Sequence, residues 1–313
     1  MKTFIRATEV WVLNGDGSAL ELGSAHYGQM DSFRQISEAS RFAYDQGLPG
    51  KAWALRHPVI LKHLQNSYFL RGDAAAEWGL TCSIALPIFS GDFLIAVVVF
   101  FCGDDEAHVG AIEIWHNDAA VGPDMGLHDG YYGTADLFSW RSKHTLFRKG
   151  TGLPGKAWSD NAPYFLANLV DADRFLRHEG THRVGLNKGL ALPFLQDPQR
   201  AYIVTLLSAR GTPIARRFEI WRNDPNNPER LIYETGDCDI QPTFHEAYAE
   251  LGIHRSDGVP GRVWLSGIPV VGALQKESAS IAELTALRDG LETIVAIPHI
   301  HNGKLNRLVC WYF

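Results

Sequence analysis

The chain begins with two stretches of mixed apolar and polar side chains that are separated by turn residues. Residues 9–13 and 19–26 are rich in strand-forming residues, and Asn14-Gly15-Asp16-Gly17 lies between them. The Asn-Gly and Asp-Gly sequences supply the positive φ angles that tight hairpin turns need. The pattern therefore predicts a β-hairpin.

Helical spacing follows this hairpin. Apolar and small side chains recur three or four residues apart at Phe33, Ile36, Ser40 and Ala43, which is typical of a helix. Residues 47–53, Gly-Leu-Pro-Gly-Lys-Ala-Trp, predict a second, short helix. Glycine allows the bend into that helix, and proline presets φ in its first turn. Pro58 is expected to end it.

The following residues predict two more strands. A polar and partly helical segment, 66–78, leads into a strand that is expected to end at Pro87, and the run 93–102 contains no polar residue. Because this run is far shorter than the ~20 residues that span a bilayer, it indicates a buried strand. Helices beside a largely antiparallel sheet give the fold class α+β.

This series of elements occurs three times. The sequence at 47–53 recurs unchanged at 152–158 and as Gly-Val-Pro-Gly-Arg-Val-Trp at 258–264, at offsets of 105 and 106 residues. Three further landmarks keep the same order around it. They are a Glu-x-Trp sequence (Glu9, Glu113, Glu219), a proline after the motif (Pro58, Pro163, Pro269) and a strand expected to end in proline (Pro87, Pro193, Pro298). A repeat of this length indicates whole domains rather than the turns of a solenoid.

We therefore divide the chain into three units, residues 1–106, 107–212 and 213–313. In the second and third units the hairpin turn is expected to be a longer polar loop, around 117–118 and 223–225. The segments that join one unit to the next are short. The units should therefore lie close together.

Composition adds mainly exclusions. The 313 residues are 46% apolar, and 29 basic against 35 acidic residues give a formal net charge of −6. A mildly acidic chain whose longest basic tract is Arg216-Arg217 lacks the electrostatic footprint that nucleic acid or an anionic membrane requires. The N-terminal residues show no secretory signal, and the four cysteines have no C-x-x-C spacing. A cytoplasmic protein with reduced, mostly buried thiols is expected.

The landmarks resemble those of the GAF superfamily of small-molecule-binding regulatory domains. The second unit follows the pattern most fully, at 152–158, Pro163, Asp173-Arg174-Phe175, Gly185-Leu186 and 189–193. The third unit is divergent, with an ordinary helix-forming segment at 278–288 in place of the Arg-rich one. The resemblance implies three tandem GAF-like domains, each with a six-stranded-type antiparallel sheet flanked by helices and a ligand pocket on one face.

In GAF-like domains the pocket lies under the Arg-rich segment. The resemblance therefore makes Arg71, Asn168, Arg174 and Arg177 the candidate ligand-binding residues. Guanidinium groups suit anionic or carboxylate ligands, and the alternative is a set of surface salt bridges. The motif tryptophans Trp53, Trp158 and Trp264 are interpreted as core residues, with stacking on a ligand as the alternative.

One segment fits a catalytic pattern. His178-Glu179-Gly180-Thr181-His182 matches H-E-x-x-H, in which two histidines bind zinc and the glutamate acts as base. Gly180 weakens a helix, and no third ligand follows. The segment is therefore interpreted as a solvated helix face, and a metal-dependent hydrolase using His178, Glu179 and His182 is the alternative. His299 and His301 are interpreted as solvent-facing residues of the last hairpin.

No nucleophile, base and orienting group recur together in the sequence, so no catalytic residue, metal ligand or cofactor is assigned. The hypothesis is a non-catalytic regulatory or sensory protein. It is expected to bind a small molecule, to associate with itself or with a separate signalling output protein, or both, because no output domain follows the last strand. The sequence identifies neither the ligand nor the unit that binds it.

Overall fold

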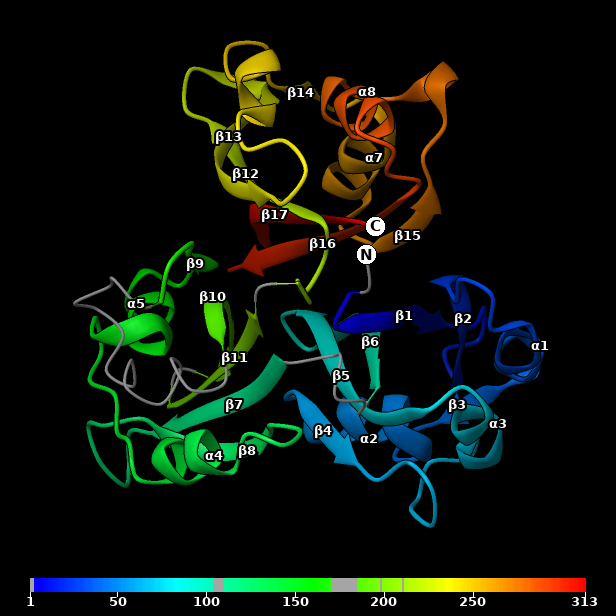
Figure 1. Cartoon of the computed structure of the whole chain (residues 1–313), viewed down its shortest axis with the longest axis vertical. Helices are drawn as coiled ribbons and strands as arrows, with labels where there is room; N and C mark the ends of the chain where they lie inside the picture. Colours follow the sequence, from blue (N-terminus) through cyan, green and yellow to red (C-terminus); the bar gives the residue numbers. More distant parts are fainter. Residues whose placement is uncertain (1–2, 104–109, 170–184, 198, 210) are drawn as a thin grey trace.

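The computed structural model of the chain describes residues 3–103, 110–169, 185–197, 199–209 and 211–313. Three antiparallel sheets make up most of it, with the helices toward the periphery (Figure 1). The predicted fold class, α+β with three tandem sheet-and-helix domains, is confirmed.

The three units contain corresponding elements. The first has β1 (Ile5–Leu13), β2 (Ala19–His26), α1 (Asp31–Ala39), β3 (Arg41–Ala43), α2 (Gly47–Leu55), β4 (Val59–Lys62), α3 (Gly72–Glu77), β5 (Leu80–Ser90) and β6 (Phe93–Gly103). The second has β7 (Gly110–Asp118), β8 (Gly126–Tyr131), α4 (Asp136–Lys143), α5 (Gly152–Asp160), β9 (Tyr164–Leu166), β10 (Leu186–Asp197) and β11 (Arg200–Ala209). The third has β12 (Arg217–Asp224), β13 (Asn227–Cys238), η1 (Phe244–Ala247), β14 (Ile253–His254), α7 (Gly258–Ser266), β15 (Val270–Ala273), η2 (Lys276–Ser278), α8 (Ile281–Arg288), β16 (Thr293–His301) and β17 (Lys304–Tyr312).

Strand order is the same in each sheet. It runs β3-β2-β1-β6-β5-β4 in the first unit, β8-β7-β11-β10-β9 in the second and β14-β13-β12-β17-β16-β15 in the third. Within the described residues, the second sheet has an isolated bridge between Met125 and Phe147 where the others have an outer strand. The six-stranded sheet that the resemblance implies is thus found in the first and third units.

Two local expectations are wrong. The expected long loop between β12 and β13 is a short turn at Pro225 and Asn226. The Asn226 backbone N–H donates a hydrogen bond to the Asp224 carboxylate at 2.9 Å, which stabilises the tight turn. The helix predicted up to Ala43 ends at Ala39, and Ala43 lies in β3, paired with Ala19. The longer loop between β7 and β8 and the helix within 278–288 are confirmed.

The three strands expected to end in proline continue past it. Pro87 pairs with Val97 on one side of β5, whereas the neighbour on the other side, β4, reaches only as far as Ala85. The same holds for Pro193 and Pro298. Each proline therefore lies where its strand has become a sheet edge, and its missing N–H costs no ladder hydrogen bond.

The repeated Gly-x-Pro-Gly motif has two separate backbone roles. Its first glycine has a positive φ in every unit, as at Gly47 (58°), which admits the helix that follows. Its second glycine packs against the chain entering the turn, since a Cβ added at Gly50 would lie 2.2 Å from the Ala43 carbonyl oxygen. The motif is therefore required for the bend and the close approach.

Both faces of each sheet are covered. Along β6, Val97, Val99 and Phe101 pack into the first unit's own core, whereas Val98, Phe100 and Cys102 pack into a core shared by all three units. The shared core includes Ile84, Ile114, Leu190, Ile220 and Trp311. Burial on both faces explains why the run 93–102 has no polar residue.

The units close a ring around this shared core, and we call the three contacts between them seams (Figure 1). At the first seam β4 lies against β8, with Lys62 Nζ 2.5 Å from Asp129 Oδ1. At the second seam Lys188 of β10 pairs with Asp237 and Asp239 of the third unit, 2.5 Å from each. At the third seam β15 lies against β2, and the Val271 amide donates to Ser24 Oγ at 3.0 Å.

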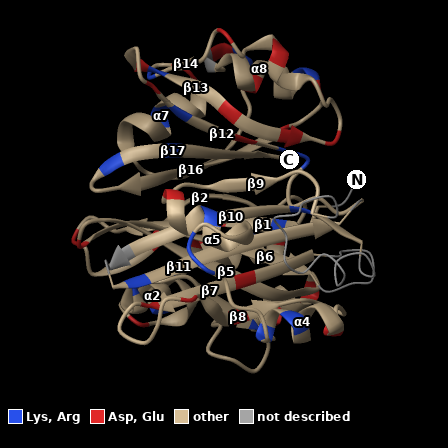
Figure 2. Ribbon diagram, turned by 90° about the vertical axis from the view of Figure 1, so that its left-hand side faces the viewer, with Lys and Arg blue, Asp and Glu red and all other residues tan. Residues whose placement is uncertain are grey.

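The described helices and cysteines fit two further expectations. None of the helices in the described part of the chain is long and apolar enough to cross a membrane. All four cysteines are buried and free, as predicted. Lys and Arg are interspersed with Asp and Glu over the three units (Figure 2).

Candidate functional site

Each unit buries a glutamate on the first strand of its sheet. Glu9, Glu113 and Glu219 have no solvent exposure. Side chains two residues apart on a strand share a face, so each carboxylate meets the tryptophan that follows it. The indole N–H of Trp11, Trp115 and Trp221 donates to that carboxylate at 2.8, 3.0 and 2.8 Å. The repeated Glu-x-Trp sequence is thus a buried hydrogen-bonded pair.

In the first unit an arginine completes this group. Arg71 donates to both oxygens of Glu9, at 2.5 and 2.9 Å, and also to Ser37. The Tyr27 hydroxyl donates to Glu9 at 2.8 Å, and burial, followed by the nearby Glu9 charge, raises the pKa of that hydroxyl. The carboxylate is therefore fully hydrogen-bonded within the protein.

In the third unit the arginine comes from another place in the chain. Arg217 lies two residues before Glu219 on β12, and its guanidinium donates to the Glu219 carboxylate and, at 2.9 Å, to Thr285 Oγ1. The hydroxyls of Tyr248 and Tyr312 donate to Glu219 at 2.6 and 3.1 Å. The Glu219 carboxylate is therefore also surrounded by protein groups.

In the second unit, three hydroxyls of the described residues bond to the carboxylate. Thr205, Ser142 and Tyr132 donate to Glu113 at 2.7, 2.8 and 3.1 Å. Each unit thus has a buried carboxylate that accepts an indole N–H and at least one tyrosine hydroxyl.

These contacts bear on the predicted ligand-binding residues. Arg71 is 3% exposed, and its guanidinium bonds to Glu9 rather than forming the surface salt bridge considered from the sequence. Asn168 is exposed and lies in the second unit, after β9. The structure does not bring these two together, and their role in binding stays a prediction. Arg174, Arg177, His178, Glu179 and His182 lie outside the described residues.

Asn168 borders a pocket of about 470 Å³ between the second and third units. Its described lining is Ala167, Asn168, Asn187, Lys188, Ala209, Gly211, Pro213 and Asp239. Asn187 Oδ1 is buried there with no hydrogen-bond partner among the described residues. Burial alone would lower the pKa of Lys188, but its hydrogen bonds to Asp237 and Asp239 outweigh this and raise it. The lining of the pocket thus includes a buried amide oxygen without a hydrogen bond among the described residues, and beside it a charged lysine.

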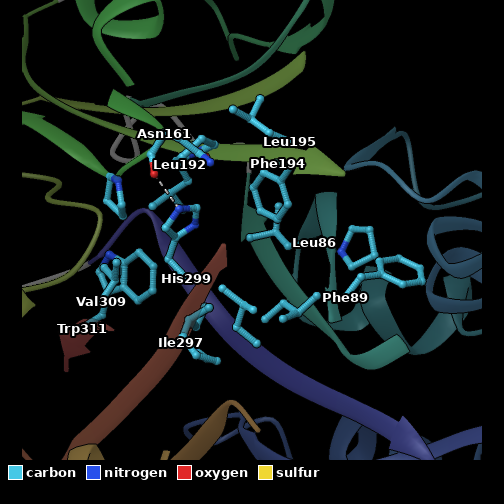
Figure 3. A pocket seen from close by; sticks show the side chains of 16 residues that line it. Leu86, Phe89, Asn161, Leu192, Phe194, Leu195, Ile297, His299, Val309 and Trp311 are labelled. Atoms are coloured by element: carbon cyan, nitrogen blue, oxygen red, sulfur yellow. Dashed lines mark hydrogen bonds between the residues drawn. The ribbon is translucent and has the colours of Figure 1, made fainter. Parts of the chain in front are cut away.

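A second pocket lies where the three units meet. It is lined by the proline-containing parts of β5, β10 and β16, together with Asn161, Pro163, Val309 and Trp311 (Figure 3). Its volume of about 40 Å³ is far below the ~300 Å³ or more of small-molecule sites. This apolar pocket is therefore too small for a metabolite.

His299 is one of the few polar groups of this second pocket. Its Nε2 donates to the Asn161 carbonyl oxygen at 2.9 Å, shown by the dashed line in Figure 3. Burial lowers the pKa of His299 to about 4, so the imidazole is neutral at pH 7. The interpretation of His299 as solvent-facing is wrong, because the third unit's last hairpin packs against the second unit; His301 is exposed.

The motif tryptophans lie at the edge of the core. Trp264 is 9% exposed, whereas Trp53 and Trp158 are half-buried. A cation covers two of the rings, Lys149 over Trp158 and Arg255 over Trp264, 5.7 and 4.8 Å from the ring centres. No group of three or more metal-ligating side chains is found among the residues that the structure describes.

Sequence reasoning missed the buried carboxylates and Arg217. A signal was present, because a charged residue recurs at the same place in a predicted strand of all three units. Charged residues are rarely buried without a partner, so the threefold Glu should have prompted a search for its cation. Arg217 was considered only as part of a basic tract.

No protein-family model matches the chain, and no curated protein matches it. Solved structures do match. The A. aeolicus nlh2 GAF domain in an inactive state is 22% identical over 33% of this chain and 60% of that chain, with a TM-score of 0.27. Three further matched structures are also GAF domains or contain one, and each of the four covers about a third of this chain.

Two further matches are proteins with other printed properties. Free methionine-R-sulfoxide reductase from Neisseria meningitidis, solved with its substrate, is 16% identical over 31% of this chain and 52% of that one, with a TM-score of 0.25. NreA from Staphylococcus aureus, mutated in its nitrate-binding site, is 10% identical over 32% and 72%, with a TM-score of 0.27. This chain covers less than two thirds of the first two structures. The likeness concerns the fold alone.

Proposed function

We propose that the chain is a regulatory protein that binds a small polar molecule in the pocket beside Asn168. The observation that carries the proposal is the size and chemistry of that pocket. Its volume of about 470 Å³ is within the range of ~300 to 1,000 Å³ typical of small-molecule sites. In the first and third units the space beside the buried glutamate is instead filled by its arginine partner.

The groups in this pocket favour a ligand with hydrogen-bond donors. Asn187 Oδ1 is a buried acceptor without a partner among the described residues, and a buried polar atom left unpaired costs about 1–3 kcal/mol. A ligand N–H or O–H that reaches this oxygen removes that cost. Asp239 and the exposed Asn168 amide provide further polar contacts at the rim.

The pocket also explains how binding is transmitted. It is lined by residues of both the second and the third unit, so a ligand bound there stabilises the second seam. A ligand at a contact between units shifts the population of the closed ring, which is the arrangement that a partner or a second copy of the chain meets. Association with an output protein remains part of this proposal.

A thermal-shift screen of nucleotides, amino acids and aromatic acids tests the proposal. A compound that binds only the folded chain at one hundred times its Kd stabilises it by about 2.7 kcal/mol, which raises the melting temperature by a measurable amount. We expect Asn168→Ala and Asn187→Ala to reduce that shift for the compound found.

Asn226→Ala is the matched control, because Asn226 is an exposed asparagine of β12–β13 outside the pocket. It should keep the full shift. A shift that survives both pocket substitutions would place the ligand elsewhere, and a screen without any shift would leave no support for small-molecule binding at this pocket.

A further inference from the structure

Histidines occupy all three seams of the ring. At the first seam His57 of the first unit meets His128 of the second, and His57 and His116 stack on the same tyrosine, Tyr202. At the second seam His299 of β16 donates to the Asn161 carbonyl oxygen at 2.9 Å. At the third seam His26 of β2 lies 3.2 Å from Thr293 Oγ1 of β16. Imidazoles are the side chains whose charge changes just below neutral pH.

The first seam has the densest group. His57 and His116 each stack on Tyr202, with both pairs of ring centres 4.4 Å apart. His128 meets the edges of this stack, 5.4 Å from His57, 5.7 Å from His116 and 5.6 Å from Tyr202. Three imidazoles therefore share one small aromatic cluster between the first and second units.

The other two seams each use one histidine between packed strands. His299 holds the last hairpin of the third unit against the residue that ends α5 in the second. His26 also stacks on Phe313, with ring centres 6.3 Å apart. In both cases the imidazole contributes a contact between two units rather than a contact within one.

Burial lowers the pKa of His26, His57, His116 and His299, the last to about 4. The charged and titratable groups that face them are Arg34 and Glu292 at His26, His128 and Arg200 at His57, His57, His128, Asp118 and Arg200 at His116, and His301 and Arg307 at His299. Glu292 and Asp118 favour the imidazolium, as do the carbonyl oxygens of Pro58 beside His57 and of Asn161 beside His299, and Asp118 also pairs with Arg200 at 3.5 Å. Protonation therefore adds positive charge beside Arg34, Arg200 and Arg307 at the seams.

We propose that the ring is a pH-sensitive device that opens along its seams on mild acidification, through protonation of the histidines at the three unit contacts. This regulation goes beyond the ligand binding proposed above and does not depend on it. The open form exposes seam surfaces that the neutral ring keeps covered.

The direction follows from linkage. The unfolded or opened chain has histidines with an ordinary pKa near 6.5, so it binds more protons than the closed ring as the pH falls. Seam stability is complete above that value and is lost as the pH falls through it toward the lower pKa values of the closed form. For His299, whose pKa is lowered to about 4, the equilibrium constant for opening rises about tenfold between pH 7.5 and 5.5.

Amide hydrogen exchange of the whole chain at pH 7.5 and 5.5, corrected for intrinsic rates, tests the proposal. Protection of the seam strands β4, β8 and β15 should fall, whereas the β1–β6 ladder inside the first unit should keep its protection. His299→Gln, which retains an amide donor for the Asn161 carbonyl, should remove about tenfold of the pH effect at the second seam.

His245→Gln is the matched control, because His245 stacks on Tyr233 within the third unit, with ring centres 5.4 Å apart, and faces no seam. It should leave the pH effect unchanged. Equal loss of protection in seam and inner strands would overturn the proposal. If the His299 variant does not fold, NMR titration of the unmodified chain decides, since pKa values of 6.5 or above at His57, His116, His26 and His299 would also overturn it. A lack of ligand in the thermal-shift screen leaves this test unaffected.

Discussion

In the first and third units a buried glutamate on the first long strand pairs with an arginine, but the two arginines come from different places in the chain. Glu9 and Glu219 occupy the same strand position, and each carries a tryptophan indole, at least one tyrosine hydroxyl and one arginine. Arg71 precedes α3, 62 residues after Glu9, whereas Arg217 is two residues before Glu219 on the same strand. The register position of Arg217 holds Ala7 in the first unit.

The difference shows that these two units share the need for a cation beside the buried glutamate, but not the position in the sequence that supplies it. A buried carboxylate has lost its water and needs a cation and hydrogen-bond donors around it. That requirement fixes where the guanidinium must lie in space, and any backbone position within reach can supply it. The divergence of the third unit in its Arg-rich segment is therefore compensated by Arg217.

Removing the cation should have the largest effect. Arg217→Met leaves Glu219 buried without its counter-charge and also breaks the bonds to Thr285 and Ala282, so we expect a loss of about 3–5 kcal/mol in the free energy of unfolding. Arg71→Met should lose slightly less, because fewer groups depend on it. Urea unfolding followed by tryptophan fluorescence measures both.

The exposed Arg34, which lies 4.0 Å from Asp31 and donates to the Gly28 carbonyl oxygen at 3.2 Å, provides the control. Arg34→Met should change stability by no more than about 0.5 kcal/mol. If Arg217→Met were equally mild, the buried pair would not be what holds the third unit together.

Moving the arginine should restore part of the loss. In Arg71→Met the space beside Glu9 is open, and Ala7→Arg places a guanidinium at the position that Arg217 occupies in the third unit. We expect the double variant to recover at least about 1 kcal/mol relative to Arg71→Met. The measurement is again the free energy of unfolding in urea.

Ala7→Arg alone should have the opposite sign, because it forces a second cation and extra volume into a packed core. Recovery in one background and loss in the other is the signature of an exchangeable cation. A double variant no more stable than Arg71→Met would show that position as well as charge is required.

The smallest effect is expected at a partly exposed pair. Lys188 bonds to Asp237 and Asp239 across the second seam, but solvent screens all three side chains. Lys188→Met should therefore cost about 1 kcal/mol or less, measured in the same way and with its salt dependence. A loss in the free energy of unfolding as large as that of Arg217→Met would mean that the second seam, rather than the buried Arg–Glu pairs, limits stability.

Local features could be predicted well from the sequence. The Asn-Gly and Asp-Gly turn, the three motif helices and the apolar strand at 93–102 depend on residues a few positions apart, and each was found. The strand ends at Pro87, Pro193 and Pro298 were wrong, because a proline ends a strand only where both neighbours are present. That condition concerns strands distant in sequence.

The candidate site was predicted less well for the same reason. Arg71 was predicted to bind a ligand, which stays a prediction, and the sequence did not indicate its partner Glu9, which is 62 residues away and on another element. His299 looks like a turn residue in the sequence and becomes a buried contact only because the second unit lies against the last hairpin.

By itself the sequence determined the threefold repeat, the order of strands and helices in each unit and the bends at the Gly-x-Pro-Gly motifs, because these follow from backbone preferences and short-range spacing. Only the tertiary structure decided three further features. The sheet faces that turn away from each unit's own core form one shared core, the ring closes between the third and the first unit, and a particular arginine pairs with the buried glutamate of the first and of the third unit. These outcomes depend on contacts between residues far apart in the chain, and local preferences carry no information about which distant groups must share a low-dielectric interior.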